Sequence, residues 1–231
     1  MRLGLIGKKI SHSGSPAIYK KLIGPHIQYD LIDIDSADDL PSINELKKNY
    51  SGINITSPYK THYVEAVQIL DPAVLKLGAI NTISFSEKGV FATNTDLVAV
   101  RTILQSFQNR YSSLKLIVLG SGVMAQMTVI LAEELGLPLQ LLNRTTHPQL
   151  SQIDLRKFED TSVQTIVINA CSRDFIFAGE ISSSSIFWDY NYHFLPHQNT
   201  LPSRVKEYQD GQEMLYLQAI AACSFWNRNN Y

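Results

Sequence analysis

A glycine-rich turn lies near the middle of the chain, between a short apolar stretch and a helical pattern. Residues 116–119 are apolar, Gly120-Ser121-Gly122-Val123-Met124-Ala125 follows, and apolar residues then recur at helical spacing. Gly120 can adopt the backbone angles of a tight turn, and Gly122 leaves room for a phosphate to approach the main chain. The pattern predicts a strand, a turn and a helix whose free N–H groups face a pyrophosphate. By itself it is equally typical of a strand-to-helix connection that binds nothing.

The segment after this helix indicates which dinucleotide would bind. In dinucleotide folds the end of the next strand meets the adenosine ribose roughly 20 residues on, where an acidic residue favours NAD and an Arg favours NADP. Here a strand predicted at residues 139–142 ends in Asn143-Arg144-Thr145. Because this segment has a guanidinium and no carboxylate, it favours NADP as the cofactor.

Composition excludes several classes of partner. The 231 residues are 45% hydrophobic and 18% charged with a net charge of −1, as in ordinary soluble globular proteins. There is no basic cluster to contact a nucleic-acid backbone, no apolar run of membrane-spanning length and no signal-peptide pattern. Cys171 and Cys223 are too few for a disulfide framework or a zinc site. We therefore expect a cytoplasmic protein with no metal and no nucleic-acid or membrane partner.

The first 95 or so residues alternate between strand and helix patterns. Strands are predicted at residues 3–6, 27–34 and 52–56 with a hairpin at 81–85 and 90–93, and helices at 15–22, 40–48, 61–70 and 97–107. Ser15 before Pro16 is predicted to be the N-cap of its helix, and Asp96 the cap of the helix at 97–107. The alternation predicts an α/β fold with a mainly parallel sheet.

Polar residues gather at the carboxyl ends of these strands, where such sheets bind ligands. They are hydroxyls, amides, one cation and one anion: Ser13, Ser15, Thr56, Lys60, Asn81, Asn94 and Asp96. This set suits a small polyhydroxylated ligand with a carboxylate, and a Lys with an Asp could transfer the proton when a hydroxyl is oxidised. The plainer interpretation is that Ser15 and Asp96 only cap helices and that Lys60 is a solvated surface charge.

Several short motifs recur along nearly the whole chain in a fixed order. The first part contains residues 7–16, Gly52-Ile53-Asn54-Ile55-Thr56 with Lys60, Gly78-Ala79-Ile80-Asn81-Thr82, and Asn94-Thr95-Asp96. The second part contains Gly120-Ser121-Gly122, Asn143-Arg144-Thr145, Ile168-Asn169-Ala170, Asp189 with Tyr192, and Gly211-Gln212-Glu213-Met214-Leu215 with Gln218. Together these motifs resemble those of the shikimate dehydrogenase family, and their shared order makes the resemblance far more specific than any single motif.

The resemblance implies a two-domain oxidoreductase that reversibly reduces 3-dehydroshikimate to shikimate with NADPH, in aromatic amino-acid (chorismate) biosynthesis. A substrate-binding catalytic domain would occupy residues 1–97, completed by a C-terminal helix at 212–231. An NADP-binding Rossmann-like domain would occupy residues 98–211, with parallel strands at 116–119, 139–142, 165–169 and 186–189 and little helix in the polar segment 150–163. Its partner would be the small-molecule substrate, and the chain would be a monomer or a homodimer.

The resemblance also implies roles for individual residues. Lys60 and Asp96 would be catalytic, with Lys60 as the acid/base at the reacting oxygen. The substrate carboxylate would be held by Ser13, Ser15 and Tyr192, and the ring hydroxyls by Thr56, Asn81, Asp96 and Gln218. The cofactor would contact Gly120, Ser121, Gly122, Val123, Asn143, Arg144, Thr145 and Gly211.

The chain departs from the family pattern mainly on the cofactor side. Cys171 stands where Thr is usual, Arg173-Asp174 replaces a Gly-containing stretch, and no second Arg follows Asn143-Arg144-Thr145. Two alternatives remain open: a sister enzyme acting on quinate or an aminated shikimate, and a non-catalytic sensor of shikimate-like metabolites. The sensor predicts loss of the proton-transfer pair, yet Lys60 and Asp96 are both present.

Overall fold

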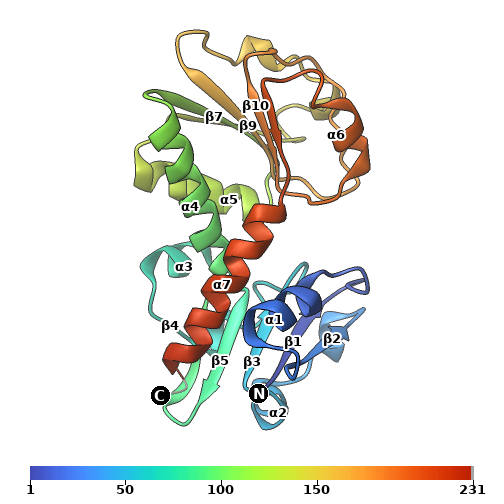
Figure 1. The fold of residues 1–231 in the computed structure, drawn as a ribbon, viewed down its shortest axis with the longest axis vertical. Helices are drawn as coiled ribbons and strands as arrows, with labels where there is room; N and C mark the ends of the chain where they lie inside the picture. The colour runs from blue at the N-terminus through green and yellow to red at the C-terminus, as the bar shows by residue number, and fades with distance from the viewer. Residues whose placement is uncertain (230–231) are drawn as a thin grey trace. The chain divides into compact units, whose positions relative to one another are not determined.

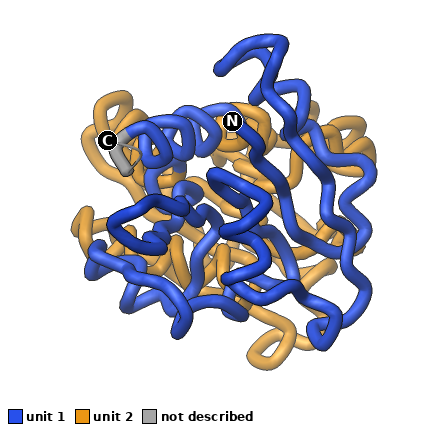
Figure 2. The backbone as a smooth tube through the Cα atoms, turned by 90° about the horizontal axis from the view of Figure 1, so that it is seen from below, with its two compact units in different colours: residues 1–99, 216–231 blue, residues 100–215 orange. Residues whose placement is uncertain are grey.

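The computed structural model describes residues 1–229. The chain divides into two compact units, unit 1 with residues 1–99 and 216–231 and unit 2 with residues 100–215 (Figure 2). Each unit is built on a sheet of its own. The helix predicted at 212–231 is present as α7 (Gln212–Asn229), and its last two predicted residues lie outside the described part of the chain. Among the described residues, no helix is long and apolar enough to cross a membrane.

Unit 1 contains a six-stranded sheet in the order β2-β1-β3-β5-β6-β4. Its strands are β1 (Arg2–Gly7), β2 (Gln28–Asp33), β3 (Gly52–Ile55), β4 (Gln68–Ile69), β5 (Thr82–Ser86) and β6 (Gly89–Thr93). β1 pairs in parallel with β2 and β3, while the β5–β6 hairpin joins β3 in antiparallel register and β4 pairs in parallel with β6. The predicted hairpin and the mainly parallel sheet are therefore confirmed.

The helices of unit 1 complete its core. They are α1 (Ser15–Ile23), α2 (Ile43–Asn49), α3 (Pro72–Leu77), the first residues of α4 (Thr95–Arg110) and most of α7 (Figure 1). Trp226 of α7 is fully buried, its indole N–H donates to the Ile83 carbonyl at 2.9 Å, and its ring lies 5.3 Å from that of Tyr19. A Cβ at Gly52 would collide with this indole, so the start of β3 requires glycine.

One helix predicted in unit 1 is wrong. Residues 61–70 form turns, a 3-10 turn (Val64–Ala66) and the edge strand β4. Gln68 and Ile69 pair with Phe91 and Ala92 of β6, so the sheet satisfies the backbone groups that the predicted helix would have satisfied. The helical signal belongs instead to α3, where Asp71 accepts from the N–H of Ala73 at 2.8 Å and Pro72 occupies the first turn.

Both predicted helix caps are also wrong. Gly14, not Ser15, precedes α1, and the N–H of Ser15 donates to Ser13 Oγ at 3.3 Å. Asp96 lies inside the first turn of α4, where its N–H donates to Asn94 Oδ1 at 3.2 Å. Both residues therefore lie inside their helices rather than before them, and the Asp96 carboxylate accepts from Lys60 instead of capping α4.

Unit 2 contains a five-stranded sheet in the order β11-β10-β9-β7-β8, with every pairing parallel. Its strands are β7 (Leu114–Leu119), β8 (Leu139–Leu142), β9 (Gln164–Asn169), β10 (Ile186–Asp189) and β11 (Glu207–Gln209), and its own helices are α5 (Val123–Leu135) and α6 (Leu195–Thr200). The segment predicted to have little helix forms two 3-10 turns, Leu150–Gln152 and Leu155–Lys157.

The strand order of unit 2 reverses at β7. From β7 the chain first goes to β8 on one side and then to β9 on the other. In open parallel sheets, ligands bind outside the carboxyl ends of the strands at such a reversal. The glycine-rich turn follows β7 directly, so this fold places it at the expected ligand crevice of unit 2.

Candidate functional site

The two predicted catalytic residues form a buried ion pair in unit 1. Lys60, which follows β3, donates from Nζ to Oδ2 of Asp96 in α4 at 2.6 Å. Their side chains are only 11% and 12% exposed, so Lys60 is not a solvated surface charge. Two charges are retained in such surroundings because each partners the other. The pair can hold a proton, or transfer one, at the end of the Lys60 side chain.

A buried polar network adjoins this pair. Asn81 Oδ1 accepts from the N–H of Thr95 at 2.7 Å, and the Thr95 hydroxyl lies 3.1 Å from Asn81 Oδ1 and 3.3 Å from Gln218 Oε1. Gln218 comes from α7, so the chain terminus contributes to the same cluster as Asn81 and Asp96. Amide and hydroxyl groups held in this way provide donors and acceptors for hydroxyls of a ligand.

Sequence reasoning missed two members of this network, Thr95 and Asn54. Asn54 accepts from the Tyr29 hydroxyl at 2.8 Å and donates to Thr82 Oγ1 at 3.0 Å. Both residues lie in motifs already singled out, Thr95 between Asn94 and Asp96 and Asn54 two residues before Thr56. Their position inside these motifs was the signal that the sequence offered.

The remaining predicted substrate residues of unit 1 lie at the same sheet edge. Ser13 and Ser15 follow β1 and their Oγ atoms are 3.2 Å apart, while Thr56 follows β3, which pairs in parallel with β1. A Cβ at Gly7 would approach Thr56 Cγ2 to 2.5 Å, so glycine there permits the close packing of the two strand ends. Tyr192 belongs to unit 2, where Arg173 donates to its carbonyl at 2.7 Å.

The glycine-rich turn of unit 2 has the geometry of a phosphate cradle. Gly120 has φ of +126°, and its N–H donates to the Leu142 carbonyl at 2.9 Å. Gly122 precedes α5, a Cβ there would meet no atom within 4 Å, and no side chain caps the helix. Ser121, which is exposed, and Val123, the half-buried first residue of α5, complete the turn. A helix N-terminus that follows a glycine with open space beside it fits the pyrophosphate of a dinucleotide.

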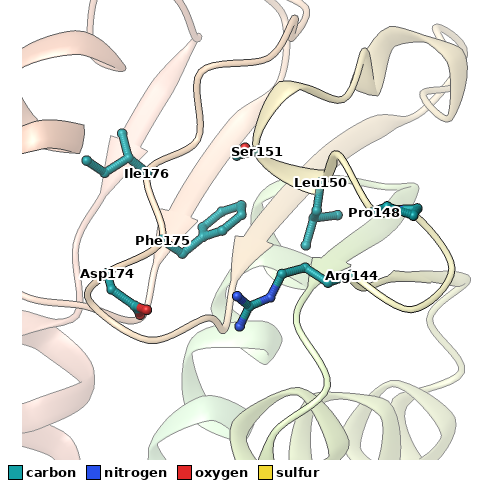
Figure 3. A pocket seen from close by; sticks show the side chains of 7 residues that line it. All are labelled: Arg144, Pro148, Leu150, Ser151, Asp174, Phe175 and Ile176. Atoms are coloured by element: carbon teal, nitrogen blue, oxygen red, sulfur yellow. The ribbon is translucent and has the colours of Figure 1, made fainter.

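Arg144 lines a pocket of about 300 Å³ in unit 2 (Figure 3). The other lining residues are Pro148, Leu150, Ser151, Asp174, Phe175 and Ile176. Asn143 Oδ1 accepts from the N–H groups of Thr145 and Thr146 at 3.0 Å each, which shapes the turn that carries Arg144. Asn143 and Thr145 thus hold the turn from which the Arg144 side chain reaches the pocket.

The structure explains why Gly211 and Asp189 occupy their positions in unit 2. A Cβ at Gly211 would collide with the carbonyl oxygen of Tyr190, so only glycine allows this approach before α7. Asp189 and His197, neither of them exposed, lie 2.5 Å apart through Oδ2 and Nδ1. Because His197 Nε2 accepts from the N–H of Phe177 at 2.8 Å, Nδ1 carries the proton and donates to Asp189. Sequence reasoning missed His197.

Comparison with known proteins shows which proteins the chain resembles. Residues 5–83 match the model of the shikimate dehydrogenase substrate binding domain. The chain resembles the shikimate dehydrogenase family in this domain. It is 27% identical to "Shikimate dehydrogenase (NADP(+))" of Methylobacillus flagellatus over 98% of this chain and 94% of that relative. The relative of the same name from Hydrogenovibrio crunogenus is 28% identical, with 96% and 91% covered. The predicted resemblance to the shikimate dehydrogenase family is therefore confirmed.

Solved structures of family members share the fold. Shikimate dehydrogenase from Aquifex aeolicus aligns with a TM-score of 0.76 at 21% identity, over all of this chain and 94% of that one. The Thermus thermophilus enzyme, solved in complex with NADP(H) and shikimate, aligns with a TM-score of 0.70 at 20% identity, covering 99% and 94%. These likenesses confirm the predicted α/β fold with a Rossmann-like unit.

Proposed function

We propose that the protein is an NADP-dependent shikimate dehydrogenase, an oxidoreductase that reversibly reduces 3-dehydroshikimate to shikimate in chorismate biosynthesis. The observation that carries this proposal is the buried Lys60–Asp96 pair, in which Lys60 belongs to the stretch that matches the substrate binding domain. Several family members bear the name shikimate dehydrogenase (NADP(+)). Unit 1 would be the substrate-binding catalytic domain and unit 2 the NADP-binding domain.

Oxidation of a secondary alcohol removes a hydride from the carbon and a proton from the oxygen. NADP, when bound, supplies the acceptor for the hydride. In its neutral form Lys60 would take the hydroxyl proton as the carbonyl forms, and in the reverse direction its ammonium would return a proton to the carbonyl oxygen. Asp96 would orient the Lys60 side chain and accept a hydrogen bond from the substrate. The balance is shikimate and NADP⁺ to 3-dehydroshikimate, NADPH and one proton.

Other side chains would bind and orient the two ligands. Ser13, Ser15 and Tyr192 would hold the substrate carboxylate, and Thr56, Asn81, Asp96 and Gln218 the ring hydroxyls. On the cofactor side, the turn of Gly120, Ser121, Gly122 and Val123 would hold the pyrophosphate, Arg144 with Asn143 and Thr145 the adenosine end, and Gly211 a further contact. The support is the polar cluster at one sheet edge of unit 1 and the uncapped helix and Arg144 pocket of unit 2. Placement in the cytoplasm, as a monomer or homodimer, stays a prediction.

A steady-state assay of the purified protein tests the proposal. Shikimate and quinate are each offered with NADP and with NAD, and reduction of the nicotinamide is followed. We expect the highest kcat/KM for shikimate with NADP. A higher kcat/KM for quinate would make the protein the sister enzyme. No reduction with any of the four pairs would favour the metabolite sensor.

A further inference from the structure

The pocket of Arg144 also contains a carboxylate. Arg144 follows β8 and Asp174 follows β9, and both side chains line the pocket. In Figure 3 the guanidinium and the carboxylate point toward the same side of it. Within residues 1–229 no hydrogen bond or ion pair joins the two side chains. An anion bound at Arg144 would therefore meet a positive and a negative group in one small volume.

The position of Asp174 is held by its surroundings. The hydroxyl of Ser172 donates to Oδ1 of Asp174, and the N–H of Phe175 donates to the Ser172 carbonyl at 3.0 Å. Phe175 is buried, and further along the same segment the N–H of Phe177 is bound by buried His197. A segment fixed at these points presents its carboxylate to the pocket as a built feature rather than as a loose surface charge.

The carboxylate carries its charge at neutral pH. The Ser172 hydroxyl, and to a smaller extent the nearby Arg144 guanidinium, lower the pKa of Asp174 below its ordinary value. A phosphate group at Arg144 would be repelled by this charge. A ribose hydroxyl in the same place would instead find an acceptor, since an ionised carboxylate accepts hydrogen bonds.

We propose that Asp174 sets the ribose specificity of the cofactor pocket, reducing the advantage that Arg144 gives to NADP over NAD. The proposal rests on the proposed function, in which this pocket receives the adenosine end of the cofactor. Arg144 favours a 2′-phosphate, Asp174 opposes it and tolerates a 2′-hydroxyl, and the balance between them determines the preference. The chain's lack of a second Arg after Asn143-Arg144-Thr145 leaves Asp174 with only one guanidinium to oppose.

The test is equilibrium binding, without turnover, of two ligands that differ only in the 2′-phosphate. Adenosine 2′,5′-bisphosphate and 5′-AMP are titrated into wild type and Asp174→Asn, and NADP and NAD are titrated in parallel. The substitution removes the charge and keeps an oxygen for the Ser172 hydroxyl. Because the site is exposed and screened by salt, we expect the ratio of bisphosphate to 5′-AMP affinity to rise by roughly three- to tenfold. The NADP to NAD ratio should rise by a similar factor.

Asp160→Asn is the matched control. Asp160 is also in unit 2 and also accepts from a Ser two residues on, Ser162, whose Oγ lies 2.7 Å away. It does not line the pocket. The control removes the same charge and should leave both affinity ratios at the wild-type value.

Three results would overturn the proposal. Unchanged ratios in Asp174→Asn, with wild type binding NADP, would overturn the role of Asp174 and leave the proposed function intact. An equal rise in Asp160→Asn would make the effect one of net charge. Wild type that binds neither dinucleotide would remove the proposed cofactor and this inference together. Thermal unfolding of each variant, and Asp174→Ser as a second substitution, separate these results from misfolding.

Discussion

The site of unit 1 and the pocket of unit 2 are built in opposite ways. Lys60 and Asp96 are buried, and the polar groups around them bond to one another. Arg144 and Asp174 are exposed at the surface of their pocket and make no bond to each other within the described residues. In the buried site each side chain is required by its neighbours, because an unpaired partner there is costly. In the exposed pocket a charge can change at little cost to folding. The sequence resembles the shikimate dehydrogenase motifs around the buried site of unit 1 and departs from that family's pattern around the Arg144 pocket of unit 2.

The largest expected effect tests the buried pair. Lys60→Ala should lower kcat by about 10²- to 10⁴-fold, the usual share of general acid/base catalysis, with a much smaller change in KM. Steady-state kinetics with shikimate and NADP measures both constants. Lys47→Ala, at an exposed position of α2, is the matched control and should keep the wild-type kcat. Near-native kcat in Lys60→Ala would remove Lys60 from the mechanism.

The pair should also behave as one unit. Asp96→Asn is expected to lower kcat and to raise KM, because the carboxylate would bind a ring hydroxyl as well as orient Lys60. In the double variant with Lys60→Ala, the loss of kcat/KM should fall well short of the product of the two single losses. Losses that multiply would show that the 2.6 Å contact has no part in the reaction.

A smaller effect is expected in the exposed pocket. Arg144→Ala should weaken NADP binding by about tenfold, the low end for a charge-assisted pair, because the guanidinium is exposed and opposed by Asp174. NAD binding should hardly change. Titration of both cofactors measures this, with Arg156→Ala as the control at an exposed ion pair of the same unit. Equal losses for NADP and NAD would make Arg144 a structural residue.

Ser13 and Ser15 test substrate binding at the edge of the buried site. Replacing either with Ala should raise KM for shikimate severalfold and leave kcat nearly unchanged, since the carboxylate is remote from the reacting carbon. Ser15 does not cap α1, but it is buried and its Oγ accepts from Ser13 Oγ, so Ser15→Ala should lower the free energy of unfolding by about 0.5 to 1.5 kcal/mol. An unaltered KM in Ser13→Ala would argue against its assignment.

The smallest effect concerns Cys171, near the cofactor pocket. Burial raises the pKa of its thiol to about 11, so the unreactive neutral form dominates at neutral pH and thiolate appears only as the pH approaches that value. We expect slow alkylation by iodoacetamide at pH 7.5 and a rate that climbs with pH up to about 11. Mass spectrometry of the labelled peptide measures the rate. Rapid labelling at pH 7.5 would show that the thiol is not protected.

Much of the buried site was predictable because its residues lie in short local motifs. Lys60 and Asp96 each follow a predicted strand or begin a predicted helix, so their approach at one sheet edge follows from topology. The pocket was harder, since Arg144 and Asp174 come from segments after different strands and nothing local indicates that they share a cavity. His197 was missed for the same reason, as its partners Asp189 and Phe177 lie elsewhere in the sequence.

The errors of the fold prediction have a common physical origin. The helix predicted at residues 61–70 gave way to an edge strand because β6, more than 20 residues away in sequence, offers it a ladder. Ser15 and Asp96 do not cap their helices because both already lie inside them, where their own N–H groups donate to Ser13 and Asn94. In each case a partner that the sequence pattern had not indicated determined how a backbone group was satisfied.

The most direct measurement of the central claim is the rate of NADP reduction by the purified wild-type protein at increasing shikimate, beside shikimate binding measured by calorimetry. The account predicts turnover that saturates in the concentration range where shikimate binds, and Lys60→Ala that still binds shikimate but turns over at least about 10²-fold more slowly. Saturable shikimate binding without any NADP reduction by the wild type would contradict it, because the buried Lys60–Asp96 pair would then serve recognition alone.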